Sequence, residues 1–305
     1  MIGRFAPSPS GRMHLGNVFS ALMAWCSVRS RNGTMLLRIE DLDPDRCRAS
    51  YAEQIKQDLL WLGLDWDTES PPQSTRTEVY ETYFDRLRER GLVYPCYCTR
   101  DQLHSASAPH ASDGQPIYAG TCRYLTDEQR KQQWRAPAWR VCVPDRKIIF
   151  TDGVYGLREE NLAEDCGDFI LRRSDGVYAY QLAVVVDDGE AGVTQIVRGC
   201  DLLGSTARQL WLQEQFGFSA PEYCHIPLLV APDGRRLSKR DRDLDIGILR
   251  ERFSAEKLIG RLAFAAHLTE TNEKISAREL AERFDWSKIK AEPITVGKDF
   301  FSYCR

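Results

Sequence analysis

The sequence has no long hydrophobic run. None of its apolar stretches approaches the roughly 20 residues that a membrane-spanning helix needs. Arg4 and Pro7 come too early for the apolar core of a signal peptide. We therefore expect a cytoplasmic protein without a membrane partner.

The chain also lacks a strong positive charge. Its formal net charge is −3, which gives no general basic field for nucleic acid. Any RNA-binding surface must then be a local patch. Scattered arginines such as Arg172, Arg173 and Arg208 are candidates for phosphate contacts, and the sequence singles out none of them.

Cysteine is too sparse for a secreted disulfide framework. The ten cysteines are spread over 305 residues, and closely spaced ones in a reducing compartment indicate metal binding instead. The composition is 43% hydrophobic and 28% charged, as in ordinary globular proteins. One large domain or two modest ones fit this length, and no internal repeat is visible.

The N-terminal stretch 4–17, RFAPSPSGRMHLGN, is the most constrained part of the chain. Residues 1–5 predict a strand, and Pro7 and Pro9 then exclude a helix. From residue 18 the apolar spacing is helical, so a helix is expected to begin near residues 14–17. A strand therefore passes through a rigid loop into a helix.

Such a helix start suits a phosphate group. Unpaired N–H groups and the positive end of the helix dipole lie there, and His14 adds a donor while Gly16 leaves room for a ligand. An ordinary turn between strand and helix is the alternative. The prolines and the Ser-Gly pair upstream favour a nucleotide site.

The next predicted strand, 34–41, ends in carboxylates. Ligands of open α/β sheets bind at the carboxyl ends of strands, so Glu40 is placed to meet one. The alternative, equally weighted on local evidence, is that Glu40 and its acidic neighbours solvate the strand end and pair with Arg46.

The remaining pattern predicts further elements around a middle block, 71–178, that reads as an insertion between two α/β halves. Capping-box pairs are Thr126 with Gln129 and Ser276 with Glu279. Helices are expected over 49–62, 77–90, 206–216, 255–267 and 277–284, and strands over 182–186, 193–197 and 224–230.

Residues 235–240, RRLSKR, form a short cationic segment after a predicted strand. Lys239 there would neutralise charge that builds up on phosphates during nucleotidyl transfer. A solvated basic loop is the usual alternative. Its combination with the loop 14–17, HLGN, makes a role in catalysis much more specific.

With these two loops the chain resembles class I aminoacyl-tRNA synthetases, and within them the glutamyl branch. The motifs that carry the resemblance are RFAPSPSG (4–11), RIEDLDP (38–44), YAYQLA (178–183) and VRG (197–199). They cover roughly residues 1–240. The resemblance implies an α/β fold with a Rossmann-type parallel sheet.

The resemblance also implies a glutamate pocket. Arg4 would pair with a carboxylate of glutamate, a bidentate role that suits a guanidinium. Ser8 would hydrogen-bond the amino acid, Glu40 would hold its α-ammonium group, and Tyr180 and Arg198 would close the pocket.

ATP, with Mg²⁺, is the second implied substrate. His14 and Lys239 would stabilise the α-phosphate and the departing pyrophosphate, with Gly16 and Asn17 in the same ATP-binding loop. The product would be glutamyl-adenylate, whose acyl group passes to a hydroxyl on RNA.

A structural zinc site is implied as well, with Cys96, Cys98, Tyr118 and Cys122 as ligands. Three thiolates and a fourth ligand close a tetrahedral structural site. The alternative is a group of small core side chains beside a tyrosine.

Some positions depart from the family pattern. Leu237 and Arg240 stand where methionine and serine are usual, Val184 replaces a pocket asparagine, and Cys200 replaces an acidic residue. The last two bear on the pocket geometry and on amino-acid affinity, not on the reaction class.

The predicted layout has catalytic halves at 1–70 and 179–240. The zinc-containing, acceptor-type α+β insert spans 71–178, and a short helical stem-contact unit spans 241–305, with no anticodon-binding domain. This layout is similar to truncated paralogues that glutamylate queuosine-34 in the anticodon loop of tRNA(Asp). We expect a monomer.

Three other functions remain open at this stage. A shortened glutamyl-tRNA synthetase would charge the 3′ end of tRNA(Glu). A small-molecule adenylate-forming ligase disagrees with the combination of Arg4, Glu40 and Arg198, and a catalytically dead RNA-binding paralogue disagrees with the presence of His14 and Lys239.

Overall fold

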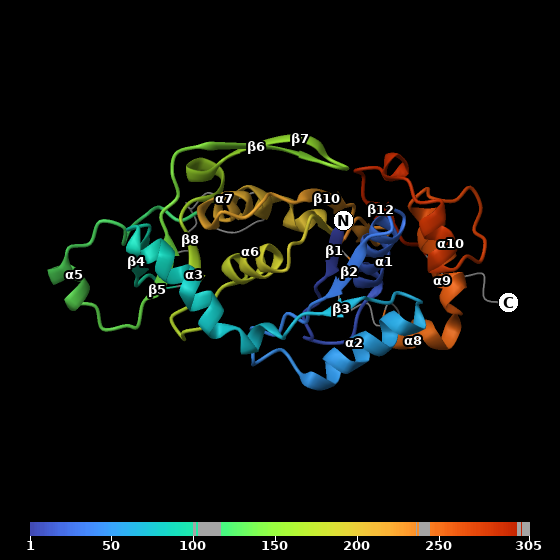
Figure 1. Ribbon diagram of the computed structural model, residues 1–305, viewed down its shortest axis with the longest axis horizontal. Coiled ribbons are helices and arrows are strands. Elements are labelled where there is room, and N and C mark those ends of the chain that lie inside the picture. Colours follow the sequence, from blue (N-terminus) through green and yellow to red (C-terminus); the bar gives the residue numbers. More distant parts are fainter. Residues whose placement is uncertain (100–101, 103–116, 236, 238–244, 298–299, 301–305) are drawn as a thin grey trace.

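The computed structural model describes the chain except residues 100–101, 103–116, 236, 238–244, 298–299 and 301–305. The molecule is elongated (Figure 1), with helix α5 (Asp127–Lys131) at one end and helices α9 (Ala255–Ala265) and α10 (Ala277–Glu282) at the other. In the part of the chain so described, no helix is both long enough and apolar enough to cross a membrane.

The centre of the fold is a seven-stranded sheet in the order β3-β2-β1-β9-β10-β6-β7. All neighbouring strands pair in parallel except β6 and β7, which form an antiparallel hairpin. The predicted parallel α/β sheet is therefore confirmed. The strands are β1 (Ile2–Phe5), β2 (Thr34–Leu37), β3 (Thr68–Glu69), β6 (Lys147–Asp152), β7 (Gly156–Asn161), β9 (Gln195–Gly199) and β10 (Glu222–Ile226).

The β6–β7 hairpin lies within the block 71–178 yet extends the main sheet. Tyr223 of β10 pairs in parallel with Asp152 at the end of β6, and the hairpin runs along one edge of the molecule (Figure 1). The middle block therefore contributes strands to the sheet that carries the pocket.

The sheet is accompanied by helices α1 (Leu15–Arg29), α2 (Ala49–Trp61), α3 (Thr77–Glu89), α6 (Tyr180–Glu190) and α7 (Thr206–Phe216). The strand predicted over 182–186 is wrong, because these residues belong to α6. Their side chains are all buried in one core cluster with α3 and α7. A helix covered on all sides shows no polar face, so its apolar run is easily read as a buried strand.

A second sheet joins β4 (Val93–Cys96), β5 (Ala138–Val141) and β8 (Phe169–Arg172), all antiparallel. Thr126 is the N-cap of helix α5: its hydroxyl accepts from Gln129 N–H, and the Gln129 side chain accepts from Thr126 N–H. The predicted capping box is confirmed. Short non-α helical segments lie at Gln73–Thr75, Leu162–Cys166, Cys200–Ser205 and Trp286–Lys288.

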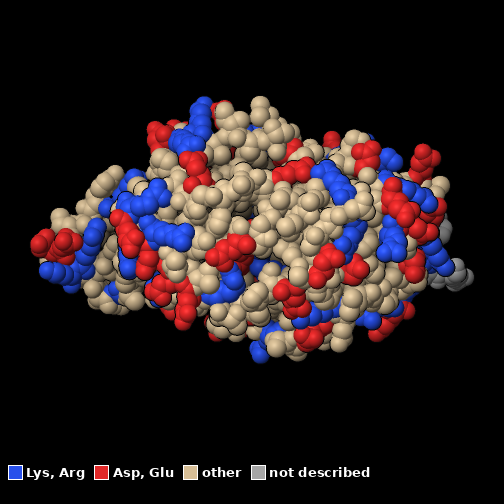
Figure 2. All heavy atoms as spheres, in the orientation of Figure 1, with Lys and Arg blue, Asp and Glu red and all other residues tan. Residues whose placement is uncertain are grey.

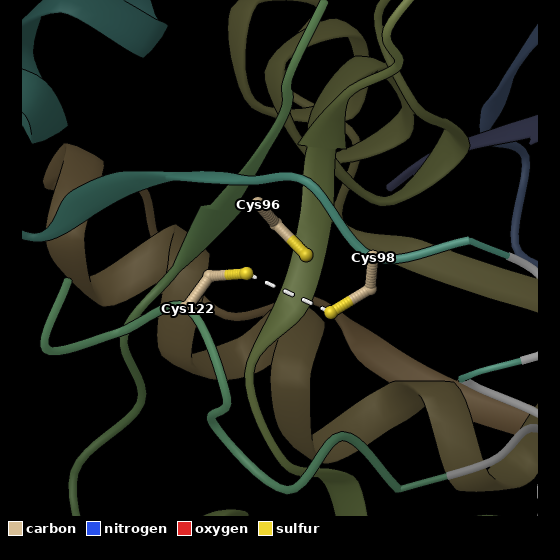
Figure 3. Close-up of side chains that lie close together, drawn as sticks. All are labelled: Cys96, Cys98 and Cys122. Atoms are coloured by element: carbon tan, nitrogen blue, oxygen red, sulfur yellow. Dashed lines mark hydrogen bonds between the residues drawn. The ribbon is translucent and has the colours of Figure 1, made fainter. Parts of the chain in front are cut away.

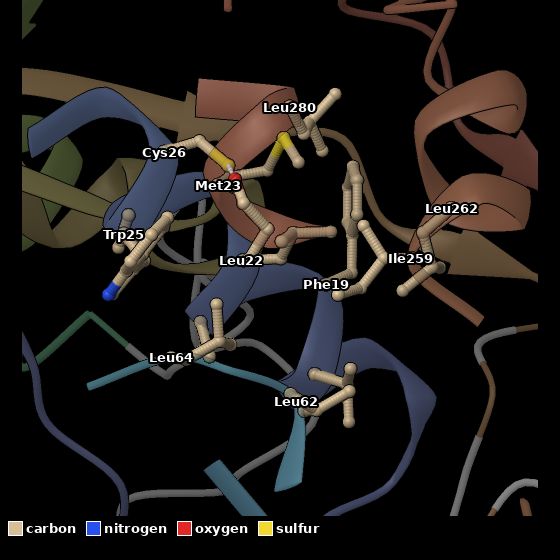
Figure 4. Close-up of a cluster of buried hydrophobic side chains, with 14 of the residues drawn as sticks. Phe19, Leu22, Met23, Trp25, Cys26, Leu62, Leu64, Ile259, Leu262 and Leu280 are labelled. Atoms are coloured by element: carbon tan, nitrogen blue, oxygen red, sulfur yellow. Dashed lines mark hydrogen bonds between the residues drawn. The ribbon is translucent and has the colours of Figure 1, made fainter. Parts of the chain in front are cut away.

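The C-terminal part contains α8 (Ile246–Arg252), α9, α10 and β12 (Ile294–Thr295), and β12 pairs in parallel with the earlier strand β11 (Leu229–Val230). The capping box of Ser276 and Glu279 opens α10 as predicted. Figure 4 shows Phe19 and Leu22 of α1 among Ile259, Leu262 and Leu280 of the C-terminal helices. The C-terminal helices and helix α1 thus share one core.

Candidate active site

A cavity of about 770 Å³ opens at the carboxyl ends of β1, β9 and β10. This is where ligands bind in open α/β sheets. The five residues predicted for glutamate all line it: Arg4, Ser8, Glu40, Tyr180 and Arg198. The loop residues predicted for ATP that the structure describes line it too: His14, Gly16 and Asn17.

The proline-containing loop is fixed to the segment after β2. Glu40 N–H donates to the Pro7 carbonyl at 3.0 Å, and Arg48 N–H donates to the Pro9 carbonyl at 3.0 Å. Ser8, between the two prolines, remains exposed on the cavity wall. These backbone hydrogen bonds hold Glu40, which follows the end of β2, at the cavity wall.

Arg4 and Glu40 belong to a buried network of charges centred on Arg38. Arg38 is 1% exposed; its Nη1 lies 2.6 Å from Asp188 Oδ1 and its Nη2 lies 3.0 Å from Glu40 Oε1. The Arg4 Nε donates to both Asp188 oxygens, at 3.2 and 3.3 Å. The alternative partner for Glu40, Arg46, lies instead 3.6 Å from Asp43 on the surface.

The network perturbs both carboxyl groups. Burial opposes ionisation of Asp188, but Arg38 and Arg4 outweigh it and lower the pKa of that carboxyl. Burial raises the pKa of Glu40 above its usual range, although Arg38 and Arg4 oppose that rise. An ammonium group entering the cavity would favour the ionised form of Glu40.

Asp187, the neighbour of Asp188, ties the network to the middle block. It accepts from Gln73 Nε2 at 2.7 Å, from Arg76 Nε at 2.8 Å and from the Tyr80 hydroxyl at 3.0 Å. Helix α6 therefore holds the cavity wall and helix α3 together through two consecutive aspartates.

Tyr180, the first residue of α6, projects at the cavity. Burial raises the pKa of its hydroxyl; Arg198 opposes that rise and Glu40 adds to it. The hydroxyl therefore stays protonated at neutral pH and is a hydrogen-bond donor.

His14 is the N-cap of α1. Its Nδ1 accepts from Gly16 N–H at 3.1 Å, and Asn17 Oδ1 accepts from His14 N–H at 3.1 Å. With Nδ1 accepting, a neutral ring carries its proton on Nε2, so His14 caps the helix with one nitrogen and has a donor at the other. The helix predicted to start near 14–17 is confirmed.

The predicted catalytic lysine, Lys239, lies outside the described residues, as does Arg240. Leu237 is described, and it lines the cavity. The turn just before it is closed by Gly234, at φ +79°, whose N–H donates to the Ala231 carbonyl at 2.8 Å.

Cys96, Cys98 and Cys122 bring their sulfur atoms within 4.8 Å of one another (Figure 3). The Tyr118 hydroxyl oxygen lies 3.5 Å from Cys96 Sγ and 3.5 Å from Cys98 Sγ, and Cys98 Sγ lies 3.6 Å from Cys122 Sγ. The four predicted zinc ligands are therefore gathered in one place.

These distances suit a tetrahedral metal. With Zn–S of about 2.3 Å and Zn–O of about 2.0 Å, two sulfurs are roughly 3.8 Å apart and sulfur and oxygen roughly 3.5 Å apart. Backbone N–H groups also point at the donors, from Cys122 to the Tyr118 oxygen at 2.8 Å and from Tyr97 to Cys122 Sγ at 3.4 Å. The donor set fits zinc.

The structure identifies further polar residues behind the cavity that the sequence motifs do not include. Asp188 supports Arg4, while Asp152 and His225 lie behind Arg198. These partners are distant in the sequence and belong to no local motif, although the pair Asp187-Asp188 after an apolar run was a visible signal.

The departures from the family pattern are also located. Val184 is buried in the core cluster of α6, and Asp201, next to Cys200, puts an acidic side chain on the cavity wall.

The structure also locates two of the arginines suggested as phosphate contacts. Arg172 Nε donates to the Gly176 carbonyl. Arg208 is buried, with 5% of its surface exposed. Arg208 is therefore wrong as a phosphate contact.

The visible face of the molecule mixes acidic and basic side chains (Figure 2). Positive and negative groups alternate over both ends, and the tan area between them surrounds the hollow near the centre. This agrees with the small net charge.

Comparison with known proteins gives one consistent answer. The family described as tRNA synthetases class I (E and Q), catalytic domain, matches residues 1–298. A glutamyl-Q tRNA(Asp) synthetase of Symbiobacterium thermophilum is 45% identical over 312 residues, covering 97% of this chain and 96% of that protein. One from Nitratidesulfovibrio vulgaris is 49% identical over 279 residues, covering 87% and 86%.

A solved structure is similar over nearly the whole chain. The glutamate tRNA ligase of Elizabethkingia meningosepticum, in complex with its amino acid, has a TM-score of 0.83 at 27% identity, covering 98% of this chain and 68% of that one. The fold, the motifs and the sequence relatives agree. The chain belongs to the class I tRNA synthetases of the E and Q type and, within them, to the family of glutamyl-Q tRNA(Asp) synthetases.

Proposed function

We propose that this ligase activates L-glutamate with ATP and transfers the glutamyl group to queuosine-34 in the anticodon loop of tRNA(Asp). The observation that carries the proposal is one cavity in which two buried arginines and a buried glutamate face the start of α1. The names of the sequence relatives support the choice of RNA.

Glutamate offers two carboxylates and one ammonium group, and the cavity matches those charges. Arg4 binds one carboxylate with paired guanidinium donors, and Arg198 binds the other with the one N–H group that its protein partners leave. Glu40 binds the α-ammonium group, and Ser8 and Tyr180 donate hydrogen bonds.

ATP lies against the first turn of α1, with Mg²⁺ on its phosphates. A carboxylate oxygen of glutamate attacks the α-phosphorus, the bond from that phosphorus to the bridging oxygen breaks, and pyrophosphate leaves. His14 and Lys239 stabilise the charge on the phosphates, and Gly16 lets them approach the backbone near Asn17.

The second step takes place on the RNA. A hydroxyl of the queuosine cyclopentene diol attacks the carbonyl carbon of glutamyl-adenylate, an ester bond forms, and AMP leaves with the electron pair. The hydroxyl proton is released to solvent or to the departing phosphate.

Zinc, held by Cys96, Cys98, Tyr118 and Cys122, has a structural role in this proposal. It would fix the ends of the segment between Cys98 and Tyr118 to strand β4. Four protein ligands fill a tetrahedral shell, so the metal supplies no catalytic position.

Each segment of the chain has one part in this proposed function. Residues 1–70 and 179–240 form the catalytic halves, 71–178 an acceptor-type insert whose β6–β7 hairpin joins the catalytic sheet, and 241–305 a stem-contact unit. The enzyme acts as a cytoplasmic monomer.

The test is transfer of [14C]glutamate to bulk tRNA from cells with and without queuosine, followed by periodate treatment. We expect labelling only of queuosine-containing tRNA, and loss of labelling when the diol is oxidised beforehand. Charging of tRNA(Glu) regardless of queuosine would make the chain a shortened glutamyl-tRNA synthetase. No charging at all would overturn both.

A further inference from the structure

Arg198 is held by four hydrogen bonds that leave it little freedom. Its Nε donates to His225 Nε2 at 3.0 Å and its Nη1 to Gln209 Oε1 at 2.6 Å; its Nη2 donates to Thr206 Oγ1 at 3.0 Å and to the Leu202 carbonyl at 3.2 Å. A guanidinium has five N–H groups, so one is left for a ligand. Its direction depends on the other four.

The bond to His225 fixes the protonation of that ring. A guanidinium only donates, so His225 Nε2 must accept, and the proton of the neutral ring sits on Nδ1. Nδ1 lies 2.6 Å from Asp152 Oδ2, and both side chains are 0% exposed. Burial lowers the pKa of His225; the Asp152 bond opposes this and Arg198 reinforces it.

Asp152 is itself oriented by the backbone. Its Oδ1 accepts from Val154 N–H at 3.0 Å and from Tyr155 N–H at 2.9 Å, in the turn of the β6–β7 hairpin. Its Oδ2 accepts from His225 N–H at 3.1 Å. The carboxylate is therefore locked as an acceptor toward the imidazole.

We propose that Asp152 and His225 are positioning residues for the amino-acid pocket: the carboxylate selects the Nδ1–H form of the ring, and the ring aims Arg198 at the substrate carboxylate. This rests on the proposed role of Arg198 in binding glutamate. It assigns to the β6–β7 hairpin, which lies outside the cavity wall, a part in amino-acid affinity.

The Asp152→Asn variant separates this role from simple packing. Its Oδ1 keeps the two turn N–H bonds and the 3.3 Å contact from His225 N–H, while its NH₂ group replaces Oδ2 and donates to His225 Nδ1. The ring then carries its proton on Nε2, which faces the Nε–H of Arg198, and two donors meet. Replacing one oxygen by an NH₂ group therefore reverses the tautomer of the His225 ring, while the volume of the side chain at position 152 stays nearly the same.

The first experiment measures ATP–pyrophosphate exchange against glutamate concentration, with bulk tRNA present, for the wild type and Asp152→Asn. We expect KM for glutamate to rise at least tenfold while KM for ATP stays within about twofold. Asp175→Asn changes an exposed aspartate in the turn between β8 and α6; it is the control and should not change either value.

The second readout is the tautomer of His225, from long-range ¹H–¹⁵N spectra of the ¹⁵N-histidine-labelled enzyme. The wild type should show the proton on Nδ1 and Asp152→Asn the proton on Nε2. An unchanged tautomer in Asp152→Asn, or a reversed tautomer with unchanged KM for glutamate, would overturn the proposal.

A pair of variants at His225 guards against loss of folding. Glutamine places an acceptor near the position of Nε2, whereas asparagine reaches only the position of Nδ1. His225→Gln should therefore stay within about threefold of the wild-type KM for glutamate, and His225→Asn should rise at least tenfold. Equal values for the two would contradict a directed contact with Arg198.

The proposed function fails in a different way. If the wild type itself shows no glutamate-dependent exchange, the glutamate reading is wrong and the positioning role falls with it. If the wild type shows exchange and the Asp152 and His225 variants have the same KM for glutamate, the proposed function stands and the positioning role alone is rejected.

Discussion

The Nε of Arg4 donates to both carboxylate oxygens of Asp188, at 3.2 and 3.3 Å, across 184 residues of sequence. The contact joins the first strand of the sheet to helix α6. Because Asp188 also accepts from Arg38 at 2.6 Å, one carboxylate compensates two buried arginines. The direction of Arg4 in the cavity depends on it.

Replacing Asp188 by asparagine should therefore impair both folding and binding. Breaking a buried charge pair on one side typically costs about 3–5 kcal/mol of unfolding free energy. We expect that loss in urea unfolding, and at least a tenfold rise in KM for glutamate in pyrophosphate exchange. A folded variant with wild-type KM would show that Arg4 is not oriented by this carboxylate.

The two nitrogens of His14 can be separated by His14→Asn. Asparagine is among the best N-caps, so the unfolding free energy should stay within about 0.5 kcal/mol. The donor at the position of Nε2 is lost, and removing one such donor lowers kcat by about 10²–10³-fold. The measurement is pyrophosphate exchange; wild-type rates would remove His14 from the chemistry.

The zinc proposal is tested by metal content and affinity. Purified wild type should contain one zinc per chain, and Tyr118→Phe should weaken binding at least tenfold in competition with a chromophoric chelator, since one ligand is lost. Cys142→Ser is the control, because Cys142 packs on the same cluster but outside the donor set. A metal-free wild type contradicts the proposal.

As the pH is lowered, the unfolding free energy should begin to fall at a higher pH than titration of the carboxylates alone would cause. The pKa of buried His225 is lowered in the folded state, so the unfolded chain binds one more proton below about pH 6.5, the ordinary value for histidine. Unfolding free energy should then decrease as the pH drops, by up to about 1.4 kcal/mol per pH unit.

This pH effect is measured by urea unfolding between pH 7.5 and 5. His225→Gln removes the titrating ring and should flatten the dependence in that range. Asp152 and Asp188, whose pKa values are lowered, lose their ionisation only further down, below about pH 4. Identical curves for the variant and the wild type would assign the acid sensitivity to other groups.

The core between α1 and α9 should behave as part of the catalytic domain. Leu262 is fully buried against it, so Leu262→Ala should cost about 2–5 kcal/mol of unfolding free energy. Phe264, on the same helix and 45% exposed, is the control, and its replacement by alanine should cost much less. Two separate unfolding transitions would argue against a shared core.

Local signals in the sequence were sufficient for several elements. The capping pairs at Thr126 and Ser276 mark the starts of α5 and α10, and the helix after His14 begins where its spacing predicts. Such signals act within one turn, so no knowledge of the rest of the fold is needed.

Strand ends were less predictable. The strand expected over 34–41 ends at Leu37: Arg38 and Glu40 still donate their N–H groups to the carbonyls of Phe5 and Pro7, but Pro7 has no N–H to donate in return. The strand expected over 224–230 is interrupted at Pro227, which has no N–H to donate. Neither boundary follows from the hydrophobic pattern alone.

The motifs located the residues that line the cavity but not those that hold them. Arg4, Glu40 and Arg198 stand in recognisable stretches, while their supports, Asp188 and His225, lie on other elements. A contact between two elements, 27 residues apart for Arg198 with His225 and 184 apart for Arg4 with Asp188, leaves no periodic pattern in the sequence, so these supporting residues are found only from the structure.

The strand order of the sheet has a consequence for biosynthesis. Strand β1 lies between β2 and β9, so the first strand to leave the ribosome gains its second neighbour only when residue 195 has been made. At about 5–20 residues per second, Arg4 waits roughly 10–40 s for Asp188. During that interval an unpaired strand edge and a buried-type arginine are exposed on the nascent chain, a state that a holding chaperone would protect.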